Sequence, residues 1–68
     1  MRMNLHLNGE LFDAPENSTI AELVSSIEIS AKRYAVEVNE TIIPRSKHDS
    51  YALSEGDNVE IVVAIGGG

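Results

Sequence analysis

The chain has 68 residues, a net charge of −6 and no cysteine, so it has room for one domain whose stability rests on aliphatic packing. The acidic balance disfavours binding to nucleic-acid phosphates or to an anionic membrane, because both need a basic face, whereas it either favours a basic protein surface or serves only solubility. No apolar run approaches the roughly 20 residues of a membrane span, and the N-terminus lacks the apolar stretch of a signal peptide, so we expect a cytoplasmic protein.

The N-terminal region has the pattern of a β-hairpin. Apolar and polar residues alternate over positions 3–7, which is typical of a half-buried strand. Asn8-Gly9 then predicts a tight turn, since both turn positions require positive φ. A return strand begins at Leu11 and is expected to end at Pro15, which has no amide hydrogen to donate.

A capping signal opens the predicted helix. Thr19 and Glu22 have the S/T-x-x-E spacing of a capping box, in which each side chain satisfies a backbone amide of the other residue. Four apolar side chains then recur at helical spacing and form one stripe: Ile20, Leu23, Val24 and Ile27. We expect a helix over roughly residues 19–28.

Three more strands are expected after the helix. Residues 34–38 alternate, a turn follows at Asn39-Glu40, and a short strand over 41–43 stops at Pro44. We interpret residues 45–51 as a polar loop with one 3₁₀ turn, and Ser54-Glu55-Gly56-Asp57 as a turn cluster. The last strand runs over 58–65, with Val59, Ile61, Val63 and Ile65 on one face and Glu60, Val62 and Ala64 on the other.

The element order is therefore β-β-α-β-β-β, or β-β-α-β-β if the short strand over 41–43 is not counted. A helix with one apolar stripe covers one face of a sheet, which predicts a two-layer α+β domain. A right-handed crossover lets the final strand pair parallel beside the first. This is the β-grasp arrangement, a mixed sheet of four to five strands with one helix, and we expect the domain over residues 1–65 and a flexible glycine tail over 66–68.

Residue types that carry catalysis are sparse. Without cysteine there is no thiol nucleophile and no thiolate metal site. His6 lies on the polar face of the first strand and His48 in the polar loop, so we expect both at the surface. The spacing gives no Ser-His-Asp set and no phosphate-binding loop. We therefore expect no active site, no metal site and no bound cofactor within this chain.

The remaining candidate is Gly66-Gly67-Gly68. Three glycines after a strand are unfavourable to order, so a frayed end or a piece of linker is one interpretation. The other is a thin arm, reaching roughly 10 Å, that threads a narrow channel and presents the ionised α-carboxylate of Gly68 to ATP in another protein. The resulting acyl adenylate would be activated toward sulfur, and a terminal thiocarboxylate is the route left to a chain without cysteine.

These features resemble the ThiS family, the sulfur carriers of thiamin thiazole biosynthesis, which have a ubiquitin-like fold. The resemblance covers essentially the whole chain and rests on these segments: the Asn8-Gly9 hairpin, the helix start Ser18-Thr19-Ile20-Ala21-Glu22-Leu23, Val36-Glu37-Val38-Asn39 with Ile43-Pro44-Arg45, Glu55-Gly56-Asp57, and Gly67-Gly68. It implies that a ThiF-like, ubiquitin-activating-type adenylyltransferase uses ATP and Mg²⁺ to adenylate Gly68. It further implies that a cysteine-desulfurase relay supplies sulfur for the thiocarboxylate and that thiazole synthase accepts it. The protein would then be a co-substrate and not an enzyme.

Strand parity adds a candidate docking surface. If Val59, Ile61 and Val63 face the helix, Val62 and Ala64 are exposed beside the tail. Arg45 is interpreted either as the charge partner of a nearby acid or as a docking residue.

Three alternative functions stay open. One is the small subunit of molybdopterin synthase, which shares the fold, the tail and the sulfur chemistry. Another is a ubiquitin-like modifier joined through Gly68 to lysines of other proteins. The third is a plain interaction domain.

Overall fold

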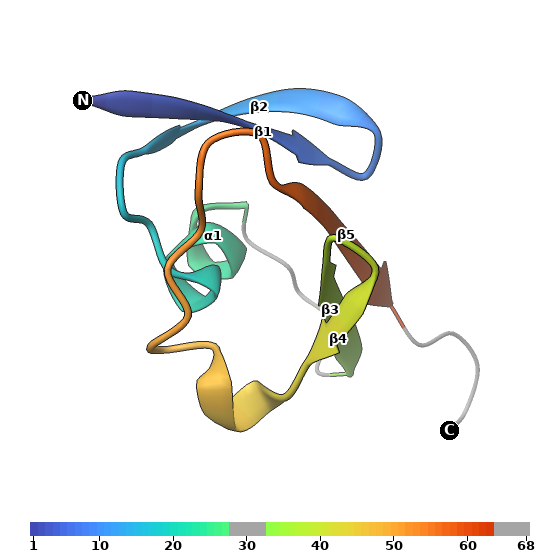
Figure 1. Ribbon diagram of the computed structural model, residues 1–68. Helices are drawn as coiled ribbons and strands as arrows, with labels where there is room; N and C mark the ends of the chain where they lie inside the picture. The colour runs from blue at the N-terminus through green and yellow to red at the C-terminus, as the bar shows by residue number, and fades with distance from the viewer. Residues whose placement is uncertain (28–32, 64–68) are drawn as a thin grey trace.

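A computed structural model describes residues 1–27 and 33–63 of the chain. In chain order the elements are β1 (Arg2–Leu7), β2 (Glu10–Pro15), α1 (Ile20–Ser26), β3 (Tyr34–Val38), β4 (Thr41–Ile43), a 3₁₀ turn (Arg45–Lys47) and β5 (Asn58–Val63). They form a five-stranded mixed sheet with α1 against one side (Figure 1). The α+β fold with the predicted element order is therefore confirmed, while the predicted end of the last strand and the tail lie outside the described residues.

Two tight turns fix the registers of the two hairpins. Asn8 and Gly9 have φ of 50° and 84°, and they bring Leu7 opposite Glu10. In the second hairpin, Asn39 and Glu40 have φ of 51° and 71°. Positive φ at both central residues gives a turn whose twist matches that of the flanking strands, so both predicted turns are confirmed.

The start of α1 is held by the predicted capping box. The Glu22 amide donates to Thr19 Oγ1 at 3.2 Å, and the Thr19 amide donates to Glu22 Oε1 at 2.8 Å. The regular helix ends earlier than predicted, at Ser26, and Ile27 is its C-cap. Ser26 Oγ donates to the Leu23 carbonyl at 2.8 Å, and such a side-chain bond competes with continuation of the backbone ladder.

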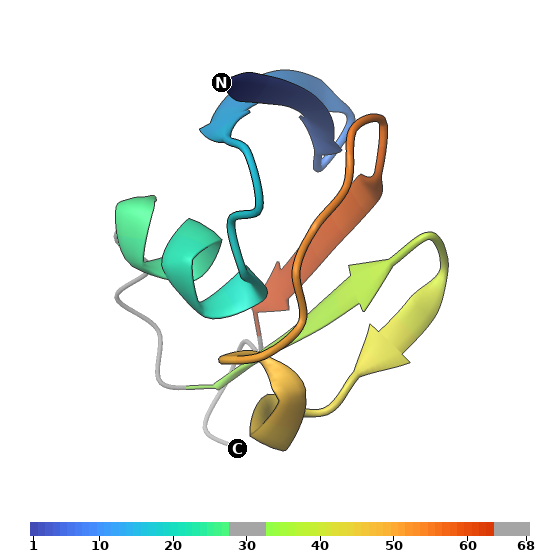
Figure 2. The same ribbon diagram turned by 60° about the vertical axis from the view of Figure 1, so that its left-hand side comes forward.

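β5 is the central strand of the sheet, which has the order β2-β1-β5-β3-β4. It pairs parallel with β1, where Leu7 lies opposite Val59, and antiparallel with β3. Figure 2 shows the β1–β2 hairpin and the β3–β4 hairpin on opposite sides of β5. The predicted parallel pairing of the first and last strands is thus confirmed.

The core lies between the sheet and α1. Its fully buried members are Leu5, Ile20, Leu23, Val36 and Val59. Ile20 and Leu23 come from the apolar stripe of α1, and the other three come from β1, β3 and β5. The periodicity seen in the sequence therefore describes this part of the core correctly.

The loop between β4 and β5 contributes to the core, which the sequence did not indicate. Leu53 is buried, and its amide donates to the Ser18 carbonyl at 2.8 Å. The prediction that His48 lies at the surface is wrong. Its side chain is 6% exposed, and its Nε2 lies 2.9 Å from the Ile43 carbonyl oxygen. A buried carbonyl needs a partner, and His48 provides it from a loop without periodicity.

Val63 lies on the same face of β5 as Val59, as predicted, but it is not buried. Burial decreases along β5, from Val59 with 0% exposed to Val63 with 40%. A helix of seven residues is about 10 Å long, whereas a six-residue strand spans about 20 Å. The end of β5 therefore projects past the cover that α1 provides.

We expect Leu23→Ala to lower the free energy of unfolding by about 2–5 kcal/mol, because it removes a buried side chain and leaves a cavity. Val62→Ala is the matched control, and on an exposed site it should change stability by less than about 0.5 kcal/mol. Urea denaturation followed by circular dichroism measures both. Equal effects of the two substitutions would contradict this account of the core.

Candidate functional site

The face of the sheet opposite α1 carries a group of five side chains on its three neighbouring strands β5, β3 and β4, of which Glu37 is half-buried and the other four are exposed. Val62 pairs with Ala35, Glu60 pairs with Glu37, and Glu37 in turn pairs with Ile42. Paired residues point to the same face, so these five side chains form one surface, the open-face patch. Ile42 is 64% exposed and Val62 is 54% exposed.

Alternation along each strand produces the open-face patch. The neighbours of its members in the chain, Val36, Ile43 and Val59, are buried toward α1. Because successive side chains of a strand point to opposite faces, residues 35, 37, 42, 60 and 62 must point away from the helix. The exposure of Val62 follows from parity as expected.

Two acids lie at the centre of the patch. Glu37 and Glu60 are directly opposite each other on β3 and β5. Among the described residues, neither carboxylate has a hydrogen-bond or salt-bridge partner. Like charges in this position destabilise a sheet, so the pair is unfavourable within the isolated domain.

Arg45 lies near the end of the described part of β5. Its guanidinium carbon is 4.1 Å from the centroid of the Tyr34 ring, within the range of a cation–π contact. Tyr34 pairs with Val63. From the sequence, Arg45 was interpreted as the charge partner of an acid or as a docking residue. The sequence separation of Arg45 and Tyr34 did not indicate this aromatic contact.

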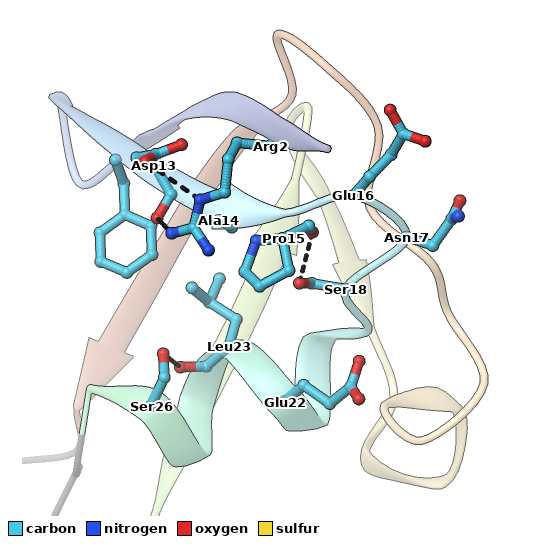
Figure 3. Close-up of a pocket in the computed structure, with 11 residues that line it drawn as sticks. Arg2, Asp13, Ala14, Pro15, Glu16, Asn17, Ser18, Glu22, Leu23 and Ser26 are labelled. Carbon is cyan, nitrogen blue, oxygen red and sulfur yellow. Dashed lines mark hydrogen bonds and ion pairs between the residues drawn. The ribbon is translucent and has the colours of Figure 1, made fainter.

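A cavity of about 550 Å³ lies between the β1–β2 hairpin and α1 (Figure 3). Three polar groups in its wall already have partners within the protein. Arg2 Nε donates to Asp13 Oδ2 at 3.2 Å, and the hydroxyls of Ser18 and Ser26 donate to backbone carbonyls at 2.6 and 2.8 Å. With these groups satisfied, the cavity offers little to fix the orientation of a ligand.

The predicted site residues divide between described and undescribed parts of the chain. Val62 belongs to the open-face patch, whereas Ala64, Gly66, Gly67 and Gly68 lie outside the described residues. Glu37 and Ile42 were not predicted as interface residues. Strand parity could have found both, because Glu37 alternates with buried valines and Ile42 adjoins the buried Ile43.

Within residues 1–27 and 33–63, no three His, Asp or Glu side chains gather closely enough to hold a metal ion. In that same part of the chain, no helix has the length and apolar character needed to cross a membrane.

Comparison with known families decides the assignment. The ThiS family matches residues 5–68, which include the three C-terminal glycines. The chain belongs to the ThiS family. The resemblance stated from the sequence is therefore confirmed, and membership supports a sulfur carrier of thiamin biosynthesis.

A solved structure has the same fold. The crystal structure of the thiamine biosynthesis protein ThiS from Geobacter metallireducens is 32% identical to this chain, with a TM-score of 0.84 over 97% of this chain and 100% of that one. A solution structure of a thiamine biosynthesis protein from the same organism gives a TM-score of 0.77 at 33% identity, over 97% of this chain and 88% of that one. The ubiquitin-like β-grasp fold is thereby shown.

Relatives include longer proteins. A thiazole synthase of Paramagnetospirillum magneticum is 36% identical over 66 residues, and one of Magnetococcus marinus is 35% identical. These matches cover 97% of this chain, which spans 20% of each synthase. The uncharacterized protein ycf40 of Porphyra purpurea is 30% identical over 97% of this chain and 93% of its own length.

We expect Glu60→Lys to raise the free energy of unfolding by about 0.2–1 kcal/mol, because it replaces a like-charge cross-strand pair by an opposite-charge pair. The gain should shrink as salt rises, since exposed charges are screened. Urea denaturation at low and high ionic strength measures both effects. Glu16→Lys makes the same charge change outside the sheet and is the control. A loss of stability for Glu60→Lys alone would contradict the opposition of Glu37 and Glu60.

Proposed function

We propose that this protein carries sulfur as a thiocarboxylate on Gly68 and delivers it for assembly of the thiamin thiazole. The family match over residues 5–68 is the observation that carries the proposal. The proposal requires the chain to provide two things, which are a docking surface on a stable domain and a terminal carboxylate.

The proposed activation begins with the Gly68 carboxylate, which attacks the α-phosphorus of ATP in a ThiF-like adenylyltransferase. Pyrophosphate leaves, with Mg²⁺ held by that enzyme compensating the phosphate charge. A cysteine persulfide of a cysteine-desulfurase relay then attacks the acyl carbon, AMP leaves, and an acyl disulfide joins the carrier to the relay cysteine. A second thiol of the partner proteins attacks the sulfur of that relay cysteine, which forms a protein disulfide and releases the carrier as the thiocarboxylate. Because the partner binds ATP and Mg²⁺, the carrier acts in this scheme as a co-substrate and not as an enzyme. The proposed location is the cytoplasm.

The relatives support thiazole synthase as the sulfur acceptor. Two proteins named thiazole synthase contain a segment similar to almost the whole of this chain. When a carrier-like segment and its acceptor are parts of one chain, the effective concentration of the segment at the acceptor site is raised. A separate carrier needs a surface that docks on the adenylyltransferase and later on the acceptor, and we propose the open-face patch around Val62, together with Ala64, for that role.

The acceptor can be tested directly. We expect the thiocarboxylate form of the chain to lose its sulfur when thiazole synthase and its other substrates are added. Mass spectrometry of the intact protein should show oxygen replacing sulfur at the terminus, without an amide link to a lysine. A chain lacking Gly67 and Gly68 is the control; it should fold normally and acquire no sulfur.

Other outcomes of this experiment identify the alternatives. Sulfur that persists with thiazole synthase but is consumed by the large subunit of molybdopterin synthase would contradict the proposed pathway. Isopeptide bonds from Gly68 to lysines of other proteins, as the main fate, would establish a modifier instead.

The width of the tail is a second test. We expect Gly67→Val to abolish adenylation, because a β-branched side chain widens an arm that must enter a narrow channel and restricts its backbone. Pyrophosphate release measures this step, and calorimetry measures binding to the adenylyltransferase, which should weaken much less. Gly67→Ala should give an intermediate rate. Normal turnover by the valine variant would remove the argument for a threaded arm.

A further inference from the structure

The centre of the open-face patch has two opposed acids, which do not contribute to the stability of the fold. Glu37 and Glu60 are directly opposite each other in the register of β3 and β5, which places their Cβ atoms about 4.5–5.5 Å apart. Two carboxylates at this spacing repel each other. Either residue could be glutamine without loss of strand pairing, because the ladder uses only backbone groups.

The described part of the chain provides no cation that relieves this repulsion. The ion pair found there, between Arg2 and Asp13, belongs to the β1–β2 hairpin. Arg45 contacts the Tyr34 ring, and position 34 alternates to the opposite face of β3 from position 37. Within residues 1–27 and 33–63, the two acids thus have no cationic partner.

Apolar side chains border the acidic pair on both sides. Ile42 is the cross-strand neighbour of Glu37 on β4, and Val62 follows Glu60 by two positions on β5. Both are more than half exposed. Exposed apolar side chains around a charged centre are complementary to a partner surface that presents a basic side chain among apolar groups.

We propose that Glu37 and Glu60 together receive an arginine of the partner protein that docks on the open-face patch, with Ile42 and Val62 contacting apolar groups of the partner around that arginine. This inference rests on the proposed function, because it names the chemistry of the surface that the adenylyltransferase presents to the carrier. Charge complementarity selects a cationic occupant for two carboxylates on a chain of net charge −6.

Arginine fits this pair better than lysine does. A guanidinium has five N–H donors in a planar fork and can donate to both carboxylates at once. An ammonium is a compact point charge that is more strongly hydrated and less readily buried at an interface. The aliphatic borders of the patch therefore favour the more weakly hydrated cation.

The test is calorimetric titration of the ThiF-like adenylyltransferase with the full chain. We expect the double variant Glu37→Gln/Glu60→Gln to bind at least about tenfold more weakly than the natural chain, with a smaller dependence of affinity on salt. Its rate of pyrophosphate release at saturating carrier should be unchanged, because docking and not chemistry is altered. Glu16→Gln removes one charge outside the sheet and should stay within about twofold. Thermal denaturation should show that none of these variants is destabilised.

The identity of the cation is tested separately. Modification of the adenylyltransferase with phenylglyoxal, which reacts with arginine, should weaken its binding to the natural chain but not to the double variant. Carbodiimide treatment of the complex joins neighbouring carboxylates and lysines. A cross-link from Glu37 or Glu60 to a partner lysine would overturn the assignment to arginine.

The outcomes separate this inference from the proposed function. If Gly68 is adenylated normally while the double variant binds like the natural chain, the inference is wrong and the carrier function stands. If binding depends on the two acids but Gly68 never acquires sulfur, the proposed function is wrong and the docking contact stands.

Discussion

The structure depends on the pairing of β1 with β5. The two hairpins are local structures at opposite sides of the sheet, and β5 is the strand that joins them. Asn8 extends this junction beyond the end of β1, since its amide donates to the Val59 carbonyl at 2.9 Å and its Oδ1 accepts from the Ile61 amide at 2.8 Å. One residue thus serves the hairpin turn and the long-range pairing together. Because β5 lies between the two hairpins, the core and the open-face patch both depend on the placement of this strand.

The length of α1 determines what the sheet can do. A helix of seven residues covers part of one face, so the other face remains free and the end of β5 extends beyond its cover. Because alternate residues of a strand point to opposite faces, the residues that stabilise the fold and those of the proposed docking surface lie on different faces of the sheet. Val59 and Ile61 contribute to the packing under the helix, whereas Glu60 and Val62 on the same strand belong to the open-face patch. A substitution on one face can alter docking without entering the core, which lets a small domain tolerate an unfavourable pair of acids.

Most of the fold could be predicted because its signals are local. The Asn8-Gly9 turn, the Thr19 capping box and the alternation within each strand all act over a few residues, and each was confirmed. The errors occurred where burial depends on how a loop without periodicity packs. His48 is buried because β4 presents a carbonyl to it, and Leu53 because its loop returns to the start of α1. For the candidate site, parity identified the exposure of Val62, but it could not show that Glu37 and Glu60 share a row, because the register of β3 on β5 is a tertiary property.

The proposed function also sets a geometric condition on the enzyme that would activate Gly68. From Val63, the last residue of β5, five further residues lead to Gly68, and a fully extended chain of that length reaches at most about 17 Å. Glu60 and Val62 lie on β5 a few residues before this arm begins, and Glu37 lies beside Glu60 on β3. Under the proposed function, a partner that binds the open-face patch must therefore hold its ATP within that reach of the surface that contacts Val62. Docking and delivery would then be linked through β5, since Glu60 and Val62 precede the arm in the chain.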